Sequence, residues 1–163
     1  MVTDVTTRAE ESIDINAPPS AGFAYCLDPQ QLFAGDPEHV VDADVIPGGV
    51  GTTAHLSMKS GVLEEADRIE YVEVLPDRII VAMHPTMSLG GTKGHHHETA
   101  LYTLTHEFES DAGGTRMTLR VQINDAPLYE RIIDRFEGKS TDRMVQNRLQ
   151  RIAQAIEASA AHG

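Results

Sequence analysis

The sequence predicts an α+β fold in which about seven antiparallel strands form a curved sheet around a long C-terminal helix, with two short helices after the first strand. The first observation behind this prediction is a run of segments between residues 39 and 123 that alternate apolar and polar residues and are separated by turn signals. The second is a stretch at residues 140–160 with the period of an amphipathic helix, whose apolar stripe is Val145, Leu149, Ile152 and Ile156. A sheet with one apolar face needs a cover, and this stretch is the longest apolar helix that the sequence predicts.

The chain opens with a polar segment, residues 1–10, which we expect to be flexible. A first strand follows at Glu11–Asn16, where apolar and polar residues alternate. A short helix is predicted to start at Pro18 or Pro19, because proline lacks only an amide that the first helical turn leaves unpaired. A second helical turn is expected after Asp28.

The next six expected strands are consecutive and joined by short turns. In the second strand we expect Val41, Ala43 and Val45 to point inward. In the fourth strand the apolar positions change from odd to even numbers, which predicts a β-bulge near Glu70. These strands are predicted at residues 39–46, 52–60, 62–75, 78–84, 96–108 and 115–123, with a loop at residues 85–94.

The length and composition predict one domain over residues 1–163, since 163 residues with 40% hydrophobic content can bury a core. No apolar run approaches the roughly 20 residues of a transmembrane helix, and the N-terminus lacks the apolar block of a signal peptide. The net charge of −12 argues against nucleic acid as a partner and against membrane insertion. A single cysteine, Cys26, agrees with a reducing compartment, so we expect a cytoplasmic protein.

The C-terminal region is predicted to contain two helical segments, Pro127–Glu137 and Ser140–Ala160, which meet at Gly138. Phe136 lies nine residues before Val145, about half a turn out of phase, so the two segments do not share one apolar stripe. The second segment is the predicted cover of the sheet. The first is either a movable lid or a kinked continuation of the same helix.

Several local motifs resemble one known superfamily. Ser12–Pro18 is similar to its opening strand and helix start, and Phe23, Leu27–Pro29 and Met144–Glu157 are similar to its first and last helices. The chain therefore resembles the helix-grip fold of the START-like, Bet v 1-like SRPBCC superfamily, which includes polyketide cyclases and dehydrases. The resemblance implies a hydrophobic cavity between sheet and helix that binds lipids, polyketides, sterols or similar small hydrophobic or amphipathic molecules.

Candidate ligand-binding residues come from the inward side of the strands, from the first C-terminal segment and from one histidine at the cavity mouth. The flexible methionines among them suit an irregular pocket, although they suit an ordinary core equally well. The candidates are Leu56, Met58, Ile69, Tyr71, Met83, His96, Leu104, Phe108, Met117, Leu119, Val121, Tyr129, Ile132 and Phe136.

Two candidate catalytic residues stand out, because alternation places His106 on the inward face and Tyr102 on the same face. A histidine of near-neutral pKa is a general acid or base, and a tyrosine donates a hydrogen bond to a carbonyl. The protein is then a cyclase, aromatase or dehydratase acting on a polyketide. Alternatively His106 is structural and the protein is a carrier or sensor, or a protein-interaction module that uses its acidic sheet face. No cofactor is expected, and a homodimer is left open.

A histidine cluster suggests a metal site at first sight. Alternation sends His95 and His97 to one face of a strand and His96 to the other, so the triplet cannot converge on one ion from a straight strand. His84 lies across the expected loop from the triplet, so a zinc site from these four residues is an alternative to our prediction of no metal.

The acidic residues of the fourth strand are expected to face solvent for the most part. Glu65 and Asp67, however, share the parity of the inward residues Leu63, Ile69 and Tyr71. One of these two carboxylates is therefore a candidate for the inner face.

Overall fold

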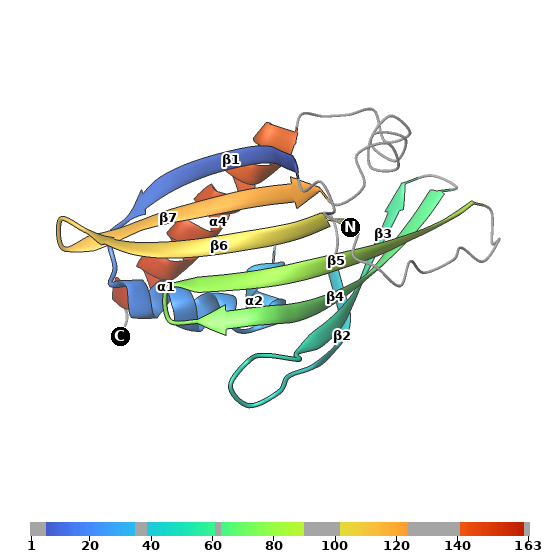
Figure 1. The fold of residues 1–163 in the computed structure, drawn as a ribbon, viewed down its shortest axis with the longest axis horizontal. Helices are drawn as coiled ribbons and strands as arrows, with labels where there is room; N and C mark the ends of the chain where they lie inside the picture. Colours follow the sequence, from blue (N-terminus) through green and yellow to red (C-terminus); the bar gives the residue numbers. More distant parts are fainter. Residues whose placement is uncertain (1–5, 35–38, 61–62, 90–101, 124–140, 162–163) are drawn as a thin grey trace.

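The computed structural model describes residues 6–34, 39–60, 63–89, 102–123 and 141–161 (Figure 1). Its elements follow the order that the sequence predicts, with one strand, two short helices, six strands and a long helix. They are β1 (Thr6–Ile15), α1 (Pro19–Cys26), α2 (Pro29–Leu32), β2 (His39–Asp44), β3 (Thr53–Ser60), β4 (Leu63–Leu75), β5 (Arg78–Leu89), β6 (Tyr102–Asp111), β7 (Gly114–Ile123) and α4 (Thr141–Ala161).

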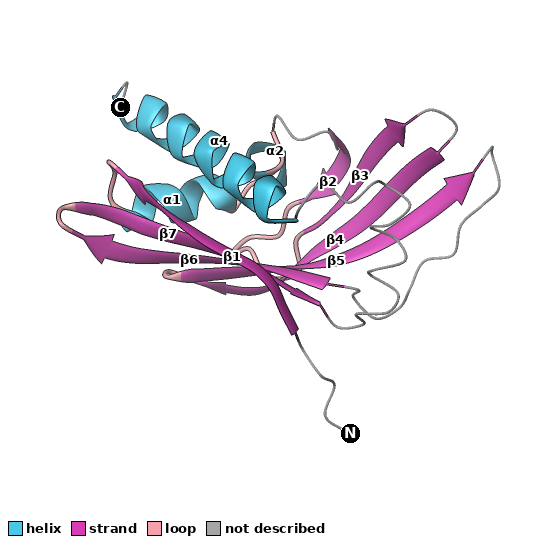
Figure 2. Ribbon diagram, turned by 90° about the horizontal axis from the view of Figure 1, so that it is seen from above, coloured by secondary structure: helices cyan, strands magenta, loops and turns pink. Residues whose placement is uncertain are grey.

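Within the described residues, seven strands form one antiparallel sheet in the order β1-β7-β6-β5-β4-β3-β2. Figure 2 shows all the helices on one side of this curved sheet, with α4 crossing the concave face. Each strand from β2 to β7 pairs with the next along the chain, and β1 closes the order beside β7. The predicted α+β helix-grip fold is therefore confirmed.

The β6–β7 hairpin shows how the alternating pattern builds the core. A tight turn joins the strands, with positive φ at Ala112 (49°) and Gly113 (85°), as a two-residue hairpin turn requires. Side chains opposite one another in this hairpin share a face, so one set lies inward and is buried. That set is Leu104, His106, Phe108, Met117, Leu119 and Val121.

Hydrogen bonds fix the short helices, and one glycine allows α1 to approach the sheet closely. The Asp28 side chain accepts from the backbone N–H of Gln30 at 2.9 Å and caps α2. The Tyr71 hydroxyl of β4 donates to the carbonyl of Cys26, at the end of α1, at 2.6 Å. A Cβ on Gly22 of α1 would lie 2.9 Å from the ring of Phe108, so this helix approaches the sheet as closely as only glycine allows.

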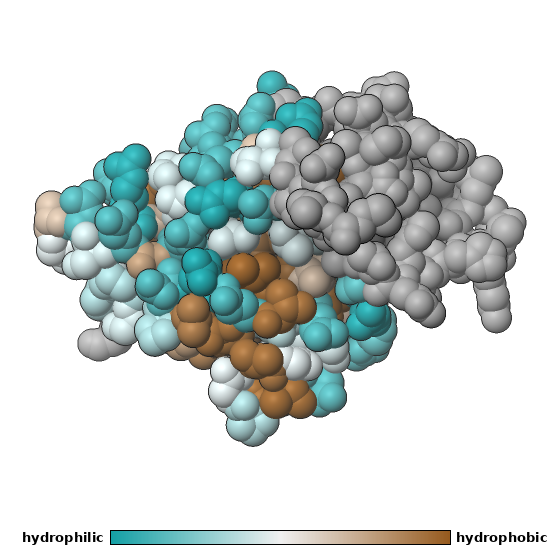
Figure 3. All heavy atoms as spheres, in the orientation of Figure 1, coloured by the Kyte–Doolittle hydropathy of each residue, from teal (hydrophilic) through white to brown (hydrophobic). Residues whose placement is uncertain are grey.

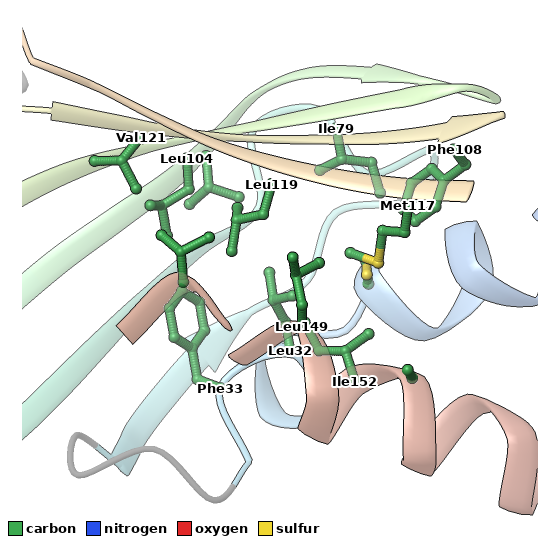
Figure 4. Close-up of a cluster of buried hydrophobic side chains, with 14 of the residues drawn as sticks. Leu32, Phe33, Ile79, Leu104, Phe108, Met117, Leu119, Val121, Leu149 and Ile152 are labelled. Carbon is green, nitrogen blue, oxygen red and sulfur yellow. The ribbon is translucent and has the colours of Figure 1, made fainter. Parts of the chain in front are cut away.

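Helix α4 buries the stripe that the sequence predicts, with Val145, Leu149, Ile152 and Ile156 at most 2% exposed. These side chains contribute to one core cluster with the inward residues of the sheet. Figure 4 shows Leu149 and Ile152 of α4 facing those residues. The helix begins at Thr141, one residue from the predicted start. The predicted segment Pro127–Glu137 and its junction at Gly138 lie outside the described residues. No helix in the described part of the chain is long and apolar enough to cross a bilayer.

The structure corrects several strand boundaries. β1 begins at Thr6, so the expectation of a flexible segment is wrong for residues 6–10, which pair with β7 and bury Ala9. β5 continues past Pro85 to Leu89 in register with β4, where we expected a loop.

The phase of β2 is also different from the prediction. Its register shifts between Val40 and Asp42, which is a β-bulge that turns Val41 outward, leaving it 61% exposed. Val45 follows the strand and is likewise exposed. The bulge predicted in β4 is present, with the shift between Tyr71 and Glu73.

Exposed apolar side chains also gather around the β2–β3 connection. The brown area of Figure 3 lies where Figure 1 shows β4 and this connection. The connection is well ordered by hydrogen bonds to β4, since Gly51 donates to the Tyr71 carbonyl at 2.9 Å and Tyr71 donates to the Thr52 carbonyl at 2.8 Å. The exposed residues of this region are Val45, Ile46, Val50 and Val72.

Candidate functional site

The interior between the sheet and α4 holds polar side chains among the apolar ones. His106 of β6 is fully buried, as is Tyr71 of β4, while Asp67 of β4 is 2% exposed and Arg148 of α4 is 6% exposed. Burying polar and charged groups costs free energy unless other groups satisfy them. These four residues therefore mark points of the core that packing alone does not explain. The strand register places Asp67, opposite Pro85, further from His106 than Tyr102 is.

His106 lies in register between Ile79 of β5 and Leu119 of β7. Its Nδ1 is 3.2 Å from the carbonyl oxygen of Ile79. A carbonyl oxygen only accepts, so Nδ1 carries the proton and donates, and Nε2 of the neutral ring is left as an acceptor. Nε2 is buried and has no hydrogen-bond partner within the described residues.

The charge state of this imidazole follows from its surroundings. The pKa of His106 is lowered from 6.5 to about 3, mainly by burial and then by the nearby Arg148 guanidinium, against a smaller opposite effect of the Ile79 hydrogen bond. The ring is therefore neutral at physiological pH. A neutral, proton-accepting nitrogen is what it presents to the interior.

Arg148 is the positive charge of the interior. Its guanidinium carbon lies 4.7 Å from the centre of the Phe33 ring, a cation–π contact between α4 and the chain after α2. The same charge acts on Cys26 and Tyr71, where it opposes the rise in pKa that burial causes. Its field thus disfavours cations and favours anions in this part of the core.

Tyr71 and Asp67 complete the set on β4. Burial raises the pKa of Tyr71, so its hydroxyl stays protonated and donates to the Cys26 carbonyl, while its oxygen lone pairs can still accept. Asp67 is in register with Leu56 and lies on the inward face, so the parity argument was right to place one carboxylate there.

Nine of the candidate ligand-binding residues lie together in the core, each at most 4% exposed. Figure 4 shows that side chains of β6 and β7 and side chains of α2 and α4 extend toward one another. His96, Tyr129, Ile132, Phe136 and the side chain of Met58 lie outside the described residues. The nine are Leu56, Ile69, Tyr71, Met83, Leu104, Phe108, Met117, Leu119 and Val121.

The two candidate catalytic residues are far apart. Tyr102 is half-buried and pairs with Met83 and Ile123, whereas His106 is four residues further along the strand. Four residues of a strand span about 13 Å, so a substrate in contact with both side chains would have to bridge this separation.

The histidine cluster is only partly described. His84 is buried on β5, opposite Arg68 of β4, and residues 95–98 lie outside the described residues. Within the described ranges, no three or more His, Cys, Asp or Glu side chains are grouped to hold a metal ion. A metal site formed by His84 and the triplet therefore stays an alternative to our prediction of no metal.

A separate pocket of about 270 Å³ opens on the helical side of the molecule, away from His106. It lies between α1, α2 and α4 and combines small side chains with a phenol, an amide and a hydroxyl. Its lining residues are Ala21, Ala24, Tyr25, Gln31, Ile156 and Ser159.

Arg148 is the site residue that the sequence argument missed. Its position was available, because residue 148 is three after Val145 and four before Ile152 and so lies on the buried stripe. An arginine at such a position is usually expected to lie at the edge of the apolar stripe with its charged end in solvent, since charged side chains are rarely fully buried.

Comparisons with solved structures identify the class of this fold. A norcoclaurine synthase of Thalictrum flavumn has a TM-score of 0.64, at 13% identity over 98% of this chain and 99% of that one. The di-domain ARO/CYC StfQ of the steffimycin biosynthetic pathway has a TM-score of 0.60, at 12% identity over 98% of this chain and 52% of that one. Protein Ms6760 of Mycobacterium smegmatis has a TM-score of 0.56, at 19% identity over 99% of both chains. These likenesses show that the chain shares the helix-grip fold of these proteins.

The family is identified from the sequence itself. Residues 6–157 match the family described as "Polyketide cyclase / dehydrase and lipid transport", and the chain belongs to it. No curated protein matches the chain. The family's description names polyketide cyclases, dehydrases and lipid transport, and StfQ is named as a di-domain ARO/CYC.

Proposed function

We propose that this protein binds a small hydrophobic or amphipathic ligand between the concave face of its sheet and α4. The observation that carries the proposal is the polar set inside the apolar core, above all Nε2 of His106, a buried acceptor without a partner in the described part of the chain. A ligand with an apolar body and a few polar groups matches such a lining. Family membership supports it, because the family's description includes lipid transport.

The charge state of His106 favours binding over acid–base catalysis. A general acid or base works best with a pKa near the working pH, whereas the pKa of His106 is about 3. Tyr102 is about 13 Å away along the strand, so a substrate in contact with both side chains would have to bridge this separation. A carrier or sensor is therefore the function that the site supports best.

A polyketide cyclase, aromatase or dehydratase is the second candidate. It is supported by the family's description and by the likeness to StfQ, which is named as a di-domain ARO/CYC. In this case turnover of a poly-β-ketone substrate should be lost in His106→Ala while binding of the substrate persists. Equal loss of turnover and binding would assign His106 a structural or binding role.

The binding proposal is tested by native mass spectrometry of gently purified protein, compared with the denatured chain, and by titration with the fluorescent probe 1-anilinonaphthalene-8-sulfonate. Leu119→Phe should reduce the bound fraction several-fold, because it adds a ring to the interior beside His106. Val72→Phe is the matched control, since it places the same ring on an exposed position of β4. Absence of any bound molecule and of probe binding, or equal effects of both variants, would refute the proposal.

The cellular compartment and the oligomeric state of the protein are part of the same proposal. We place it in the cytoplasm, since Cys26 is a free, buried thiol and so needs no oxidising compartment. A homodimer stays a prediction, and size-exclusion chromatography with light scattering would decide it.

A further inference from the structure

The tautomer of His106 limits what the interior site can recognise. Because Nδ1 donates to the Ile79 carbonyl at 3.2 Å, the one N–H proton of the neutral ring is used in a hydrogen bond to the backbone of β5. Nε2 then carries a lone pair and no proton. It can accept a hydrogen bond, but it cannot donate one to the carbonyl, ester or carboxylate oxygen of a bound molecule.

The nitrogen lies where the ligand of the proposed function would bind. His106 is in register with Leu119, whose side chain points from β7 toward α4 (Figure 4), and side chains opposite one another in an antiparallel pair share a face. The side chain of Met117, on the same strand, extends from the sheet toward the helices. Its unbranched side chain can change rotamer and make room beside the imidazole.

No group of the described residues satisfies this acceptor. The Tyr71 hydroxyl is directed to the Cys26 carbonyl at 2.6 Å, and Nε2 of His106 has no partner among the described residues. A buried acceptor without a donor costs free energy, so a bound molecule that donates a hydrogen bond to it removes this cost and binds more tightly.

Arg148 decides which kind of donor is suitable. Both ammonium groups and hydroxyl groups donate hydrogen bonds, but an ammonium group would be repelled by the guanidinium on the buried face of α4. A hydroxyl group is neutral, and the same positive charge favours the partial negative charge on its oxygen when the proton is shared with the imidazole.

We infer that the ligand of this site is an apolar molecule with a hydroxyl group, an alcohol or a phenol, whose O–H donates to Nε2 of His106. This inference rests on the proposed function, because it names the chemical class of the ligand for that same interior site. It sets hydroxylated ligands apart from hydrocarbons, esters, ketones and amines of similar size.

The test compares 2-naphthol with 2-methoxynaphthalene, which has the same ring system without the O–H. Isothermal titration of the wild type should give a dissociation constant about tenfold lower for 2-naphthol, the value of one net hydrogen bond. In His106→Met the preference should disappear, and in His106→Gln it should be partly restored, because the amide oxygen can accept. Val72→Met is the control, since it changes an exposed residue of β4 and leaves the acceptor in place, so it should keep the wild-type preference.

The outcomes separate the inference from the function on which it rests. If neither probe binds the wild type, the proposed function fails. If both probes bind equally well, or if the preference for 2-naphthol survives in His106→Met, the protein binds ligands but the inference is wrong. Thermal unfolding of each variant shows that it is folded at the temperature of the titration.

Discussion

Acid should destabilise this protein in large part through one buried histidine. His106 is fully buried, and its pKa falls from 6.5 to about 3 in the folded chain, first through burial and then through the charge of Arg148. The unfolded chain returns the imidazole to its ordinary pKa. Between these two pKa values the unfolded state binds more protons, so the folded state is fully favoured above pH 6.5 and loses stability as the pH falls toward 3.

The magnitude follows from the width of this window. One pKa unit corresponds to about 1.4 kcal/mol, so lowering the pH from 6.5 to 5 should remove about 2 kcal/mol of the free energy of unfolding through His106 alone. The whole window corresponds to about 5 kcal/mol, which is comparable to the total stability of many small domains.

Urea unfolding at pH 7 and at pH 5 measures this effect. The wild type should lose about 2 kcal/mol more between the two pH values than His106→Met, which has no imidazole at this position. At pH 7 the variant should be at least as stable as the wild type, because it no longer buries an acceptor without a partner. Leu119→Met controls for disturbance of the core, since it should keep the wild-type difference between the two pH values.

A direct titration checks the same reasoning. The ring protons of His106 should show no titration by NMR between pH 7 and pH 5 in the folded protein. A measured pKa above 6, or equal acid sensitivity of the wild type and His106→Met, would mean that the imidazole is hydrated or moves out of the core when it is protonated.

Two further predictions concern the helices. Gly22→Ala should destabilise the protein by about 1 kcal/mol in urea unfolding. The reason is that overpacking against Phe108 costs about 1–3 kcal/mol, which exceeds the gain of about 1 kcal/mol in helix propensity. Adding Phe108→Leu should recover the loss, and no recovery would show that the strain lies elsewhere. Arg148→Met should raise the pKa of His106, measured by NMR, because it removes the second cause of the depression and leaves burial in place. An unchanged pKa would show that the guanidinium is too well screened to act on the imidazole.

The sequence predicts most of the architecture because the relevant signals are local. Alternation in β6 and β7 identifies the inward face, and the spacing from Val145 to Ile156 identifies the buried stripe of α4. Where the prediction fails, a tertiary contact is responsible. Residues 6–10 look like a polar tail but form a strand because β7 offers a free edge to pair with.

The bulge in β2 is another feature that the alternation of apolar and polar residues does not predict. The alternation of Val41, Ala43 and Val45 is regular, yet the register with β3 shifts by one residue and turns Val41 to the solvent. A shift of one residue reverses the face of every following side chain, and only the partner strand determines where it occurs.

What the sequence determined by itself is the curved antiparallel sheet with its covering helix, and the presence of His106 and a carboxylate on the inward face, since each follows from a short-range period. The family was suggested by the resemblance of local motifs. What only the tertiary structure decided is the chemistry of the interior. The tautomer of His106 depends on a carbonyl 27 residues away in the chain, and its charge depends on burial and on Arg148, 42 residues away. Electrostatics and hydrogen bonding act through space, so the acceptor at Nε2 becomes visible only when β5, β6 and α4 are packed together.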